Sequence, residues 1–292
     1  MQLITIAGRF HALTGALDDP ATRAVDVTTL TGLDADPTAF LAADGLGRLT
    51  EHDPAAVARH PSIALAGADL DPVVPRPRTV WAVGVNYRAH AAEMGREPPS
   101  APTLFTKSVG SLIGHGAAIV VPPCVTQPDY EGEVAVVIGR TARDVDEDDA
   151  LEVIAGISIA HDVSSRDHQY TTGQWSWSKS FDTFCPLGPV LTILAGPDAV
   201  PLELGALAIE TRLNDVVVQS SNTADLIFSI PRLVAWITQG QTLLPGDVIL
   251  TGTPGGVGAA QDPPRWLRDG DNVAITVAGV GTLRNPIRRT GS

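Results

Sequence analysis

The sequence contains little cysteine and little positive charge. Its two cysteines, Cys124 and Cys185, form no Cys-x-x-Cys pair and indicate no disulfide framework, so we interpret them as packed thiols of a reducing compartment. Only 20 of the 292 residues are Lys or Arg, against 33 Asp or Glu, and the net charge is −13. An acidic surface of this kind argues against nucleic acids and anionic membranes as partners.

The marks of export and of membrane insertion are missing too. The first residues, MQLITIAGRFHAL, have no basic segment followed by a long apolar run, which a signal peptide would have. No stretch comes near the roughly 18 apolar residues that a membrane-spanning helix needs. We therefore predict a cytoplasmic protein that makes no contact with membranes.

The patterns that are present predict two parts. The segment 70–80, LDPVVPRPRTV, carries three prolines and is expected to be an extended linker. It divides a small N-terminal domain, residues 1–72, from a larger domain, residues 73–292. In the first we expect a strand in MQLITIAG and one short helix in PTAFLAADGLGRL. In the second, apolar β-branched runs outnumber helical segments, so the expected fold class is α+β, mainly β.

Acidic residues alternate in the stretch DYEGEV, at Asp129, Glu131 and Glu133. Alternate residues of a strand project from one face, so these carboxylates repel each other unless a cation lies among them. A solvated strand edge is the simplest explanation. However, the apolar run IAGISIAHD ends at Asp162, close to a core where an unpaired charge is costly. Two glutamates and this aspartate form an oxygen-only ligand set, which favours Mg²⁺, Mn²⁺ or Ca²⁺ over zinc.

Polar residues continue after Asp162. Ser164 is expected to begin a helix, with Asp167 as its capping-box partner. On this helix Arg166 and Gln169 lie three residues apart, so their side chains share a face.

Three other features have ordinary explanations when they are considered alone. His90 and Glu93 form the pattern H-x-x-E, in which a carboxylate can orient an imidazole on a helix, but the bare pattern is typical of a surface pair. Lys179, next to aromatic residues in SWSKSF, is typical of a surface lysine. The stretch GTPGGVG lacks the Lys-Ser/Thr that a phosphate-binding loop would add.

Five motifs occur in order along the chain: GVNYRAHAAEMG, DYEGEVAVVIGR, AHDVSSRDHQ, KSFDTFCPLGPVL and LLPGDVILTGTPGGVG. With them, residues 80–287 resemble the fumarylacetoacetate hydrolase family. The resemblance implies a mixed β-roll or β-sandwich catalytic domain and a homodimer. It also implies one Mg²⁺ or Mn²⁺, replaced in some crystals by Ca²⁺, with Glu131, Glu133 and Asp162 as ligands. Asp129 would then be a surface acid or an acid behind these ligands.

The same resemblance implies roles for six further residues. It assigns catalysis to His90, Glu93 and Lys179, and substrate contacts to Arg166, Gln169 and Thr253. The histidine and its glutamate match a water-activating pair on a mobile lid. The lysine would stabilise the developing oxyanion or the substrate carboxylate.

Members of the family act on 2-oxo acids, which can chelate a hard metal through two oxygens. The metal then stabilises the enolate that forms when a bond at C3 breaks. The leading hypothesis is therefore a hydrolase that cleaves a C–C bond in a 2,4-dioxo acid of the acylpyruvate type. A decarboxylase or keto–enol tautomerase for an oxaloacetate-like diacid stays open. So does a non-catalytic metal- or ligand-binding protein on the same fold, although Lys179, His90 and Glu93 argue against it.

Two departures from the family concern the substrate. Animal fumarylacetoacetate hydrolases have an aspartate ligand where this chain has Val83, so the resemblance is to the three-carboxylate bacterial branch. Many relatives carry a basic residue just before the active-site lysine, whereas this chain has Ser176, Trp177 and Ser178. An uncharged wall at this place predicts a less acidic or bulkier substrate tail.

Overall fold

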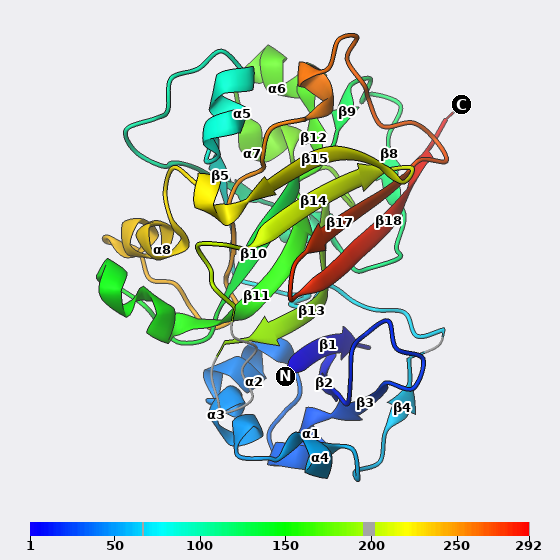
Figure 1. Cartoon of the computed structure of the whole chain (residues 1–292), viewed down its shortest axis with the longest axis vertical. Helices are drawn as coiled ribbons and strands as arrows, with labels where there is room; N and C mark the ends of the chain where they lie inside the picture. Colours follow the sequence, from blue (N-terminus) through cyan, green and yellow to red (C-terminus); the bar gives the residue numbers. More distant parts are fainter. Residues whose placement is uncertain (66, 195–201, 292) are drawn as a thin grey trace.

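The computed structural model describes residues 1–65, 67–194 and 202–291. Two sheets pack against each other, and short helices surround them (Figure 1). The larger sheet has 11 strands and the smaller sheet has 5. The expected fold class, α+β and mainly β, is confirmed. None of the helices in the described part of the chain has the length and apolarity of a membrane span.

The strands of the larger sheet follow the order β4 (Ile63–Ala64), β3 (Arg23–Asp26), β2 (Arg9–Leu13), β1 (Gln2–Ile6), β13 (Cys185–Ile193), β11 (Ile154–His161), β10 (Gly132–Ile138), β16 (Val248–Leu250), β5 (Val80–Gly84) and β6 (Thr103–Lys107), with β7 (Leu112–Ile113) beside β13. The smaller sheet follows the order β15 (Val216–Asn222), β14 (Ala208–Leu213), β17 (Asn272–Val277), β18 (Gly281–Arg289) and β8 (Ile119–Val121). A separate pair consists of β12 (Ser164–Ser165) and β9 (Pro128–Asp129).

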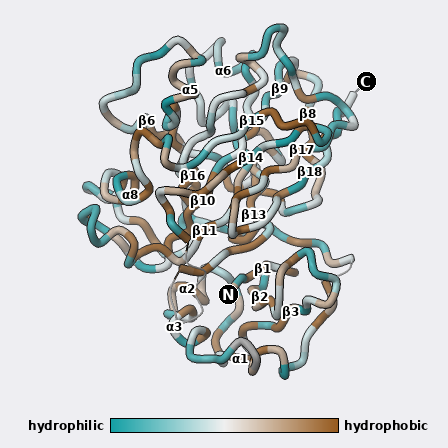
Figure 2. The backbone as a smooth tube through the Cα atoms, viewed as in Figure 1, coloured by the Kyte–Doolittle hydropathy of each residue, from teal (hydrophilic) through white to brown (hydrophobic). Residues whose placement is uncertain are grey.

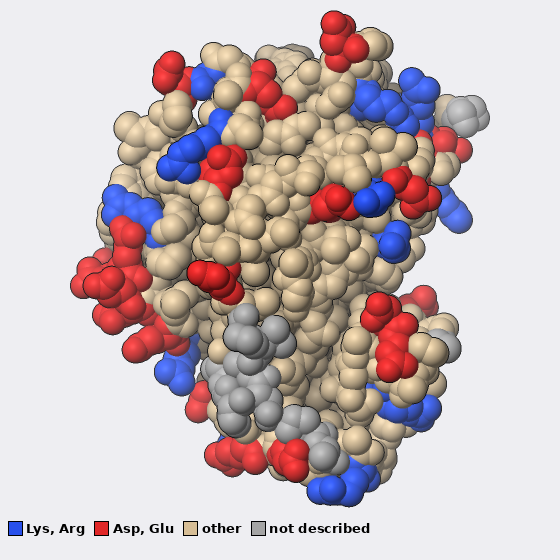
Figure 3. All heavy atoms as spheres, viewed as in Figure 1, with Lys and Arg blue, Asp and Glu red and all other residues tan. Residues whose placement is uncertain are grey.

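The helices are short. The α-helices are α1 (Val27–Thr31), α2 (Pro37–Ala42), α3 (Gly45–Thr50), α4 (Pro54–Val57), α5 (Arg88–Glu93), α6 (Arg166–Thr172), α7 (Trp175–Ser178) and α8 (Ile230–Thr238). The 3₁₀ turns are Val109–Ser111, Glu147–Val153, Thr223–Asp225 and Gly258–Ala260. Figure 3 shows acidic side chains gathered where the second of these turns lies below α8, in keeping with the acidic composition.

Two central strands, β10 and β11, position the acidic motif. Every residue of both strands is buried, because apolar side chains cover the two faces of the larger sheet. Val134 packs into the core on one face, and Ala135 packs into the core on the other. In Figure 2 the hydrophobic segments accordingly gather along the central strands. The antiparallel register places Gly132 opposite His161, so the start of β10 lies beside the end of β11.

The N-terminal strands continue the larger sheet. The strand expected in MQLITIAG is confirmed as β1, and it pairs antiparallel with β13, with Leu3 opposite Leu191. Behind β2, the ring of Phe10 packs edge to face on Phe40, with 5.9 Å between the centroids. The N-terminal segment is thus hydrogen-bonded to the larger part of the chain, and the division at residue 72 stays a prediction.

The prediction of a single helix in PTAFLAADGLGRL is wrong, because the structure has two helices there. Instead, α2 begins at Pro37 after the capping carboxylate of Asp36, and it ends at Ala42. The second helix, α3, begins at Gly45. Between the two helices, Asp44 has a left-handed backbone with φ 54°, which interrupts a right-handed helix.

Candidate active site

Three buried carboxylates meet at the edge where β10 begins and β11 ends. Glu131 precedes β10, Glu133 lies within it, and Asp162 directly follows β11. Each offers an oxygen atom, and these atoms all lie within 4.8 Å of one another. The peptide nitrogen of Asp162 donates to the backbone oxygen of Glu131 at 2.9 Å, which continues the strand pairing into the site. The oxygen-only set predicted from the sequence is therefore assembled in space.

Lys179 lies among these carboxylates. Its Nζ donates to Glu131 Oε2 at 2.7 Å and to Asp162 Oδ2 at 2.6 Å, and it lies 5.0 Å above the ring centroid of Phe105. Burial alone would lower the pKa of Lys179, but the charges of Asp162 and Glu131 outweigh burial and raise the pKa. The lysine is therefore an ammonium ion held within the site rather than a surface side chain.

Arg166 binds the first two acids of the alternating motif, Asp129 and Glu131. Its Nε donates to Asp129 Oδ2 at 2.8 Å and its Nη2 donates to Glu131 Oε1 at 2.6 Å. Its Nη1 donates to Gln169 Oε1 at 2.9 Å, so the expected shared face of Arg166 and Gln169 exists. Asp129 is 0 % exposed, so the idea that it is a surface acid is wrong. It is an acid behind the site that helps to fix the guanidinium.

The helix that carries Arg166 begins later than expected. Ser164 and Ser165 form β12, and the first helical residue of α6 is Arg166. The carboxylate of Asp167 is no capping-box partner of Ser164, since it accepts from the backbone and hydroxyl of Thr126 at 2.7 and 2.6 Å. Ser164 and Ser165 instead pair with Asp129 and Pro128 of β9, so the helix begins only at Arg166.

Glu133 differs from the other two carboxylates in having no cation beside it. It accepts a hydrogen bond from Gly252 N at 2.6 Å, and within the described ranges no ion pair involves it. Burial and the charges of Asp162 and Glu131 raise its pKa well above the usual value. By contrast, the pKa of Glu131 is lowered, because Lys179 and Arg166 outweigh the effect of burial. A divalent cation would fit this set, since it would neutralise the carboxylate that the protein leaves uncompensated.

The stretch GTPGGVG and the residue that follows it, Ala259, bind the acids of the site through their backbone. Four backbone N–H groups point at three carboxylates: Gly252 at Glu133 (2.6 Å), Gly256 at Glu93 (2.7 Å), Gly258 at Asp129 (2.7 Å) and Ala259 at Asp129 (3.0 Å). At Gly256 the φ is +103°, and a Cβ atom would lie 2.1 Å from the backbone oxygen of Val218. Only glycine fits there, because a side chain would clash with the backbone of Val218 and because this positive φ is strained for any other residue. The loop thus orients carboxylates by backbone donors instead of binding phosphate.

His90 and Glu93 form a pair at the edge of the same site. His90 Nδ1 lies 2.6 Å from Glu93 Oε1, and the side chains are 9 % and 21 % exposed. Because Glu93 is an acceptor, Nδ1 carries the proton and Nε2 is left free as a base. The other oxygen of Glu93 accepts from Gly256 N, so the pair is tied to the glycine-rich loop.

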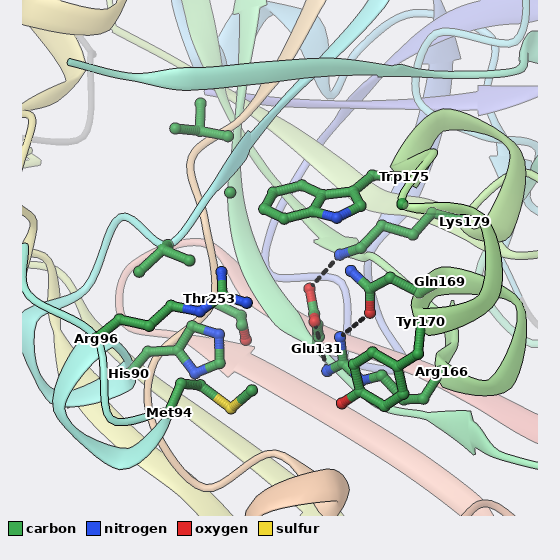
Figure 4. Close-up of a pocket in the computed structure, with 14 residues that line it drawn as sticks. His90, Met94, Arg96, Glu131, Arg166, Gln169, Tyr170, Trp175, Lys179 and Thr253 are labelled. Atoms are coloured by element: carbon green, nitrogen blue, oxygen red, sulfur yellow. Dashed lines mark hydrogen bonds and ion pairs between the residues drawn. The ribbon is translucent and has the colours of Figure 1, made fainter. Parts of the chain in front are cut away.

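One pocket of about 270 Å³ connects these groups (Figure 4). Six residues predicted from the sequence line it: His90, Glu131, Arg166, Gln169, Lys179 and Thr253. The hydroxyl of Thr253 donates to Gly132 O at 3.0 Å and accepts from Gln219 Nε2 at 2.8 Å. The remaining three predicted residues, Glu93, Glu133 and Asp162, lie directly behind this lining, so all nine predicted residues form one site.

These motifs also match one known family. A sequence profile described as "Fumarylacetoacetate (FAA) hydrolase C-terminal" covers residues 79–288 of the chain. The chain belongs to the fumarylacetoacetate hydrolase family.

Named relatives carry out several reactions. The oxaloacetate tautomerase YisK of Bacillus subtilis is 42 % identical over 228 residues, which cover 77 % of this chain and 74 % of that protein. The 2-hydroxyhepta-2,4-diene-1,7-dioate isomerase of Mycobacterium marinum has a TM-score of 0.78 at 33 % identity, with 100 % of both chains covered. The maleylpyruvate hydrolase of Sphingobium sp. SYK-6, solved with manganese(II) and pyruvate, has a TM-score of 0.80 at 30 % identity, again with 100 % of both chains covered.

Two residues of this site in the fumarylacetoacetate hydrolase family fold, Lys107 and Gln219, were not predicted from the sequence. The fully buried Lys107 donates from Nζ to Asp162 Oδ1 at 2.5 Å. Gln219 reaches from the smaller sheet and accepts from Gly132 N at 3.0 Å. A compositional signal existed for the lysine: the chain has 18 arginines but only two lysines, Lys107 and Lys179. A chain that otherwise uses arginine places both lysines in this site.

The uncharged wall expected next to the active-site lysine is not part of the pocket. Trp177 is 54 % exposed and packs against His168 and Phe181, with centroids 5.0 and 5.8 Å away. The tryptophan that lines the pocket is Trp175. The prediction of a less acidic substrate tail therefore loses its structural basis.

Proposed function

We propose that this protein is a divalent-metal-dependent keto–enol tautomerase for a small 2-oxo dicarboxylic acid of the oxaloacetate type. The geometry that supports this most directly is the free Nε2 of His90 in the same pocket as Glu131 and Lys179. A single base beside a charge-stabilising lysine is what a proton shift between C3 and the C2 oxygen needs. The similarity to an oxaloacetate tautomerase and to a dioate isomerase supports the same reaction class.

The residues that would hold the metal are Glu131, Glu133 and Asp162, and Mg²⁺ or Mn²⁺ suits their oxygen atoms. When bound, the ion supplies a Lewis acid for the 2-oxo carboxylate end of the substrate. Arg166 and Gln169 face the same pocket and would hydrogen-bond this end of the substrate. The neighbouring maleylpyruvate hydrolase, solved with manganese(II) and pyruvate, supports this choice of ion.

The proton transfer itself would be carried by side chains of this chain. His90 Nε2 takes the proton from C3, and the electron pair of the C–H bond becomes the C2=C3 double bond. The C2 oxygen gains negative charge beside the Lys179 ammonium, and Glu93 stabilises the imidazolium. His90 then returns a proton to the C2 oxygen, which completes the enol. The reverse sequence gives the keto form, and no proton is gained or lost overall.

C–C bond hydrolysis of an acylpyruvate remains the second candidate, since the 2.6 Å pair of His90 and Glu93 could equally take a proton from water. The neighbouring maleylpyruvate hydrolase favours this candidate. A homodimer in the cytoplasm, with a 2-oxo acid as its small-molecule ligand, is part of the same proposal.

The deciding experiment compares both reactions on one preparation. Enol–keto conversion of oxaloacetate is followed by ultraviolet absorbance, and acylpyruvate cleavage is followed by loss of the dioxo chromophore, each with Mg²⁺, with Mn²⁺ and with EDTA. We expect metal-dependent acceleration of the oxaloacetate conversion, and its loss in Glu131→Gln. Cleavage of acylpyruvate without any acceleration of tautomerisation would make the protein a hydrolase.

A further inference from the structure

One cationic side chain of the pocket lining, that of Arg96, is unpaired among the residues that the structure describes. Arg96 lines the pocket together with His90 and Glu131. In Figure 4 the side chain of Arg96 reaches into the pocket beside His90 and Thr253. Across the described residues, neither an ion pair nor a hydrogen bond involves its guanidinium group. Arg96 is an exposed residue, so solvent reaches its guanidinium group, and the five donors of this fixed fork are open to a ligand.

The backbone places Arg96 in this position through the end of helix α5. Gly95 has a left-handed backbone with φ +63°, and its N–H donates to Ala92 O at 3.0 Å. The N–H of Arg96 donates back to Ala91 O at 2.9 Å. These two bonds form a Schellman motif, which turns the chain back over the end of the helix. Arg96 is therefore fixed to the same helical unit as His90.

The residue type at this position departs from the usual rule. In a Schellman motif, the residue after the left-handed glycine commonly makes an apolar contact with the last turn of the helix. Here it is a charged arginine that turns toward the pocket. A residue that breaks a local rule without a compensating contact in the protein points to an external ligand.

The charges around Arg96 select an anion. The acid that lines this pocket is Glu131, and Arg166 and Lys179 already bind its two oxygens. The lining also includes the uncharged side chains of Met94, Tyr170 and Trp175. Arg96 is thus free to bind a carboxylate that lies away from the metal ligands, in a bidentate pair if the anion is planar.

We propose that Arg96 determines the specificity for a short 2-oxo dicarboxylate by binding the distal carboxylate of the substrate. This rests on the proposed function, which supplies the dicarboxylate and places its 2-oxo end at Glu131, Glu133 and Asp162. The pocket volume of about 270 Å³ restricts the chain to a few carbons, below the roughly 300–1,000 Å³ that drug-sized ligands occupy. With both ends held, C3 lies between them, within reach of His90 on the unit that carries Arg96.

A matched pair of ligands tests the proposal. The two ligands are 2-oxoglutarate and 2-oxopentanoate, which share a five-carbon 2-oxo acid chain and differ in the distal carboxylate. Binding to the Mg²⁺-loaded protein is measured by titration calorimetry. We expect wild type to prefer 2-oxoglutarate, and Arg96→Gln to weaken 2-oxoglutarate binding about tenfold, the range for a charge-assisted hydrogen bond. The affinity for 2-oxopentanoate should stay within about twofold, and Arg96→Lys should restore part of the loss.

The control variant is Arg59→Gln, which removes an equal charge from an exposed position in the N-terminal segment. It should leave both affinities unchanged, and all variants should keep the wild-type melting temperature. Equal weakening of both ligands in Arg96→Gln would overturn the proposal, because the arginine would then act on the helix rather than on the distal group. Unchanged affinities would overturn it as well, and so would a wild-type protein that binds neither ligand.

The outcome separates this proposal from the proposed function. A wild-type protein that fails to convert oxaloacetate, while Arg96→Gln still loses the diacid selectively, would remove the tautomerase and keep the distal-carboxylate site. A protein that converts oxaloacetate, but whose affinities for the two ligands are the same in Arg96→Gln as in wild type, would keep the tautomerase and remove the distal-carboxylate site.

Discussion

The ammonium group of Lys107 donates a hydrogen bond to the backbone oxygen of Lys179. The two lysines also bind opposite oxygens of one carboxylate: Lys107 binds Oδ1 of Asp162 at 2.5 Å, and Lys179 binds Oδ2 at 2.6 Å. Because the Lys107 side chain is 0 % exposed, it has no contact with substrate and acts on the site through Asp162 and Lys179. We therefore assign it a positioning role.

We predict that Lys107→Met lowers the free energy of unfolding by about 3 kcal/mol, the usual cost of removing one partner of a buried ion pair. The carboxylate of Asp162 would keep Lys179 as a partner and lose Lys107, which no water can replace at this buried position. The measurement is urea unfolding in EDTA. The double variant Lys107→Met with Asp162→Asn should recover much of the loss, since the carboxylate that Lys107 compensated is then a neutral amide. A Lys107→Met protein as stable as wild type would contradict the assignment.

The second prediction concerns pH and rests on Glu133. Its pKa in the folded protein is raised above 4.5 by burial and by Asp162 and Glu131. The folded state therefore keeps a proton that the unfolded state has lost, so stability falls as pH rises from about 4.5 toward the folded pKa. We expect this loss in metal-free wild type as the pH rises above about 4.5, the ordinary pKa of a glutamate. It should be absent in Glu133→Gln, which is neutral throughout.

Saturating Mg²⁺ should cancel the same loss, because the ion binds the deprotonated carboxylate and its affinity rises with pH. Thermal unfolding at four pH values, with EDTA or with Mg²⁺, measures both effects. Identical pH slopes for metal-free wild type and Glu133→Gln would show that the glutamate ionises normally in the folded protein.

The third prediction concerns Lys179. If it stabilises charge on the C2 oxygen, Lys179→Met should lower kcat by about 10²–10³, the typical cost of one preorganised donor. KM should change much less, and Mg²⁺ binding measured by calorimetry should persist, since the carboxylates remain. Near-normal turnover in Lys179→Met would exclude a catalytic role for this lysine.

The nine site residues could be predicted because each lies in a short motif through which the chain resembles the fumarylacetoacetate hydrolase family, whereas spacing alone pointed only to the oxygen-only set of Glu131, Glu133 and Asp162. Lys107 and Gln219 could not be predicted in this way. Their partners lie 55 residues away for Lys107 and 87 for Gln219, and only strand register brings them together. The start of α6 was missed for a similar reason, since the pairing of β12 with β9 overrides a local capping signal.

The partners of the backbone N–H groups in the glycine-rich loop could not be predicted from the sequence either. A pattern such as GTPGGVG indicates a tight loop with exposed N–H groups, but it does not say which anion they bind. The structure supplies the answer through the carboxylates of Glu93, Asp129 and Glu133. Arg96 is a comparable case, because its role depends on a Schellman turn that directs an ordinary surface residue into the pocket.

The last prediction concerns His90, which separates the candidate reactions. For tautomerisation, its Nε2 moves the C3 proton, so His90→Ala should lower enol–keto conversion of oxaloacetate by at least about 10². Glu93→Gln should cost less, since the ring stays near but loses the carboxylate that stabilises the imidazolium. Metal affinity should hardly change in either variant.

Decarboxylation of oxaloacetate needs no base at this position, because CO₂ leaves without transfer of a proton from C3. Any decarboxylase activity should therefore survive His90→Ala far better than tautomerisation does. His115→Ala is the matched control, since His115 lies outside the pocket and contacts the backbone of Arg284. Wild-type rates in His90→Ala would exclude the histidine as the proton carrier. Equal loss of tautomerisation, decarboxylation and ligand binding would instead identify His90 as a residue that holds helix α5 in place.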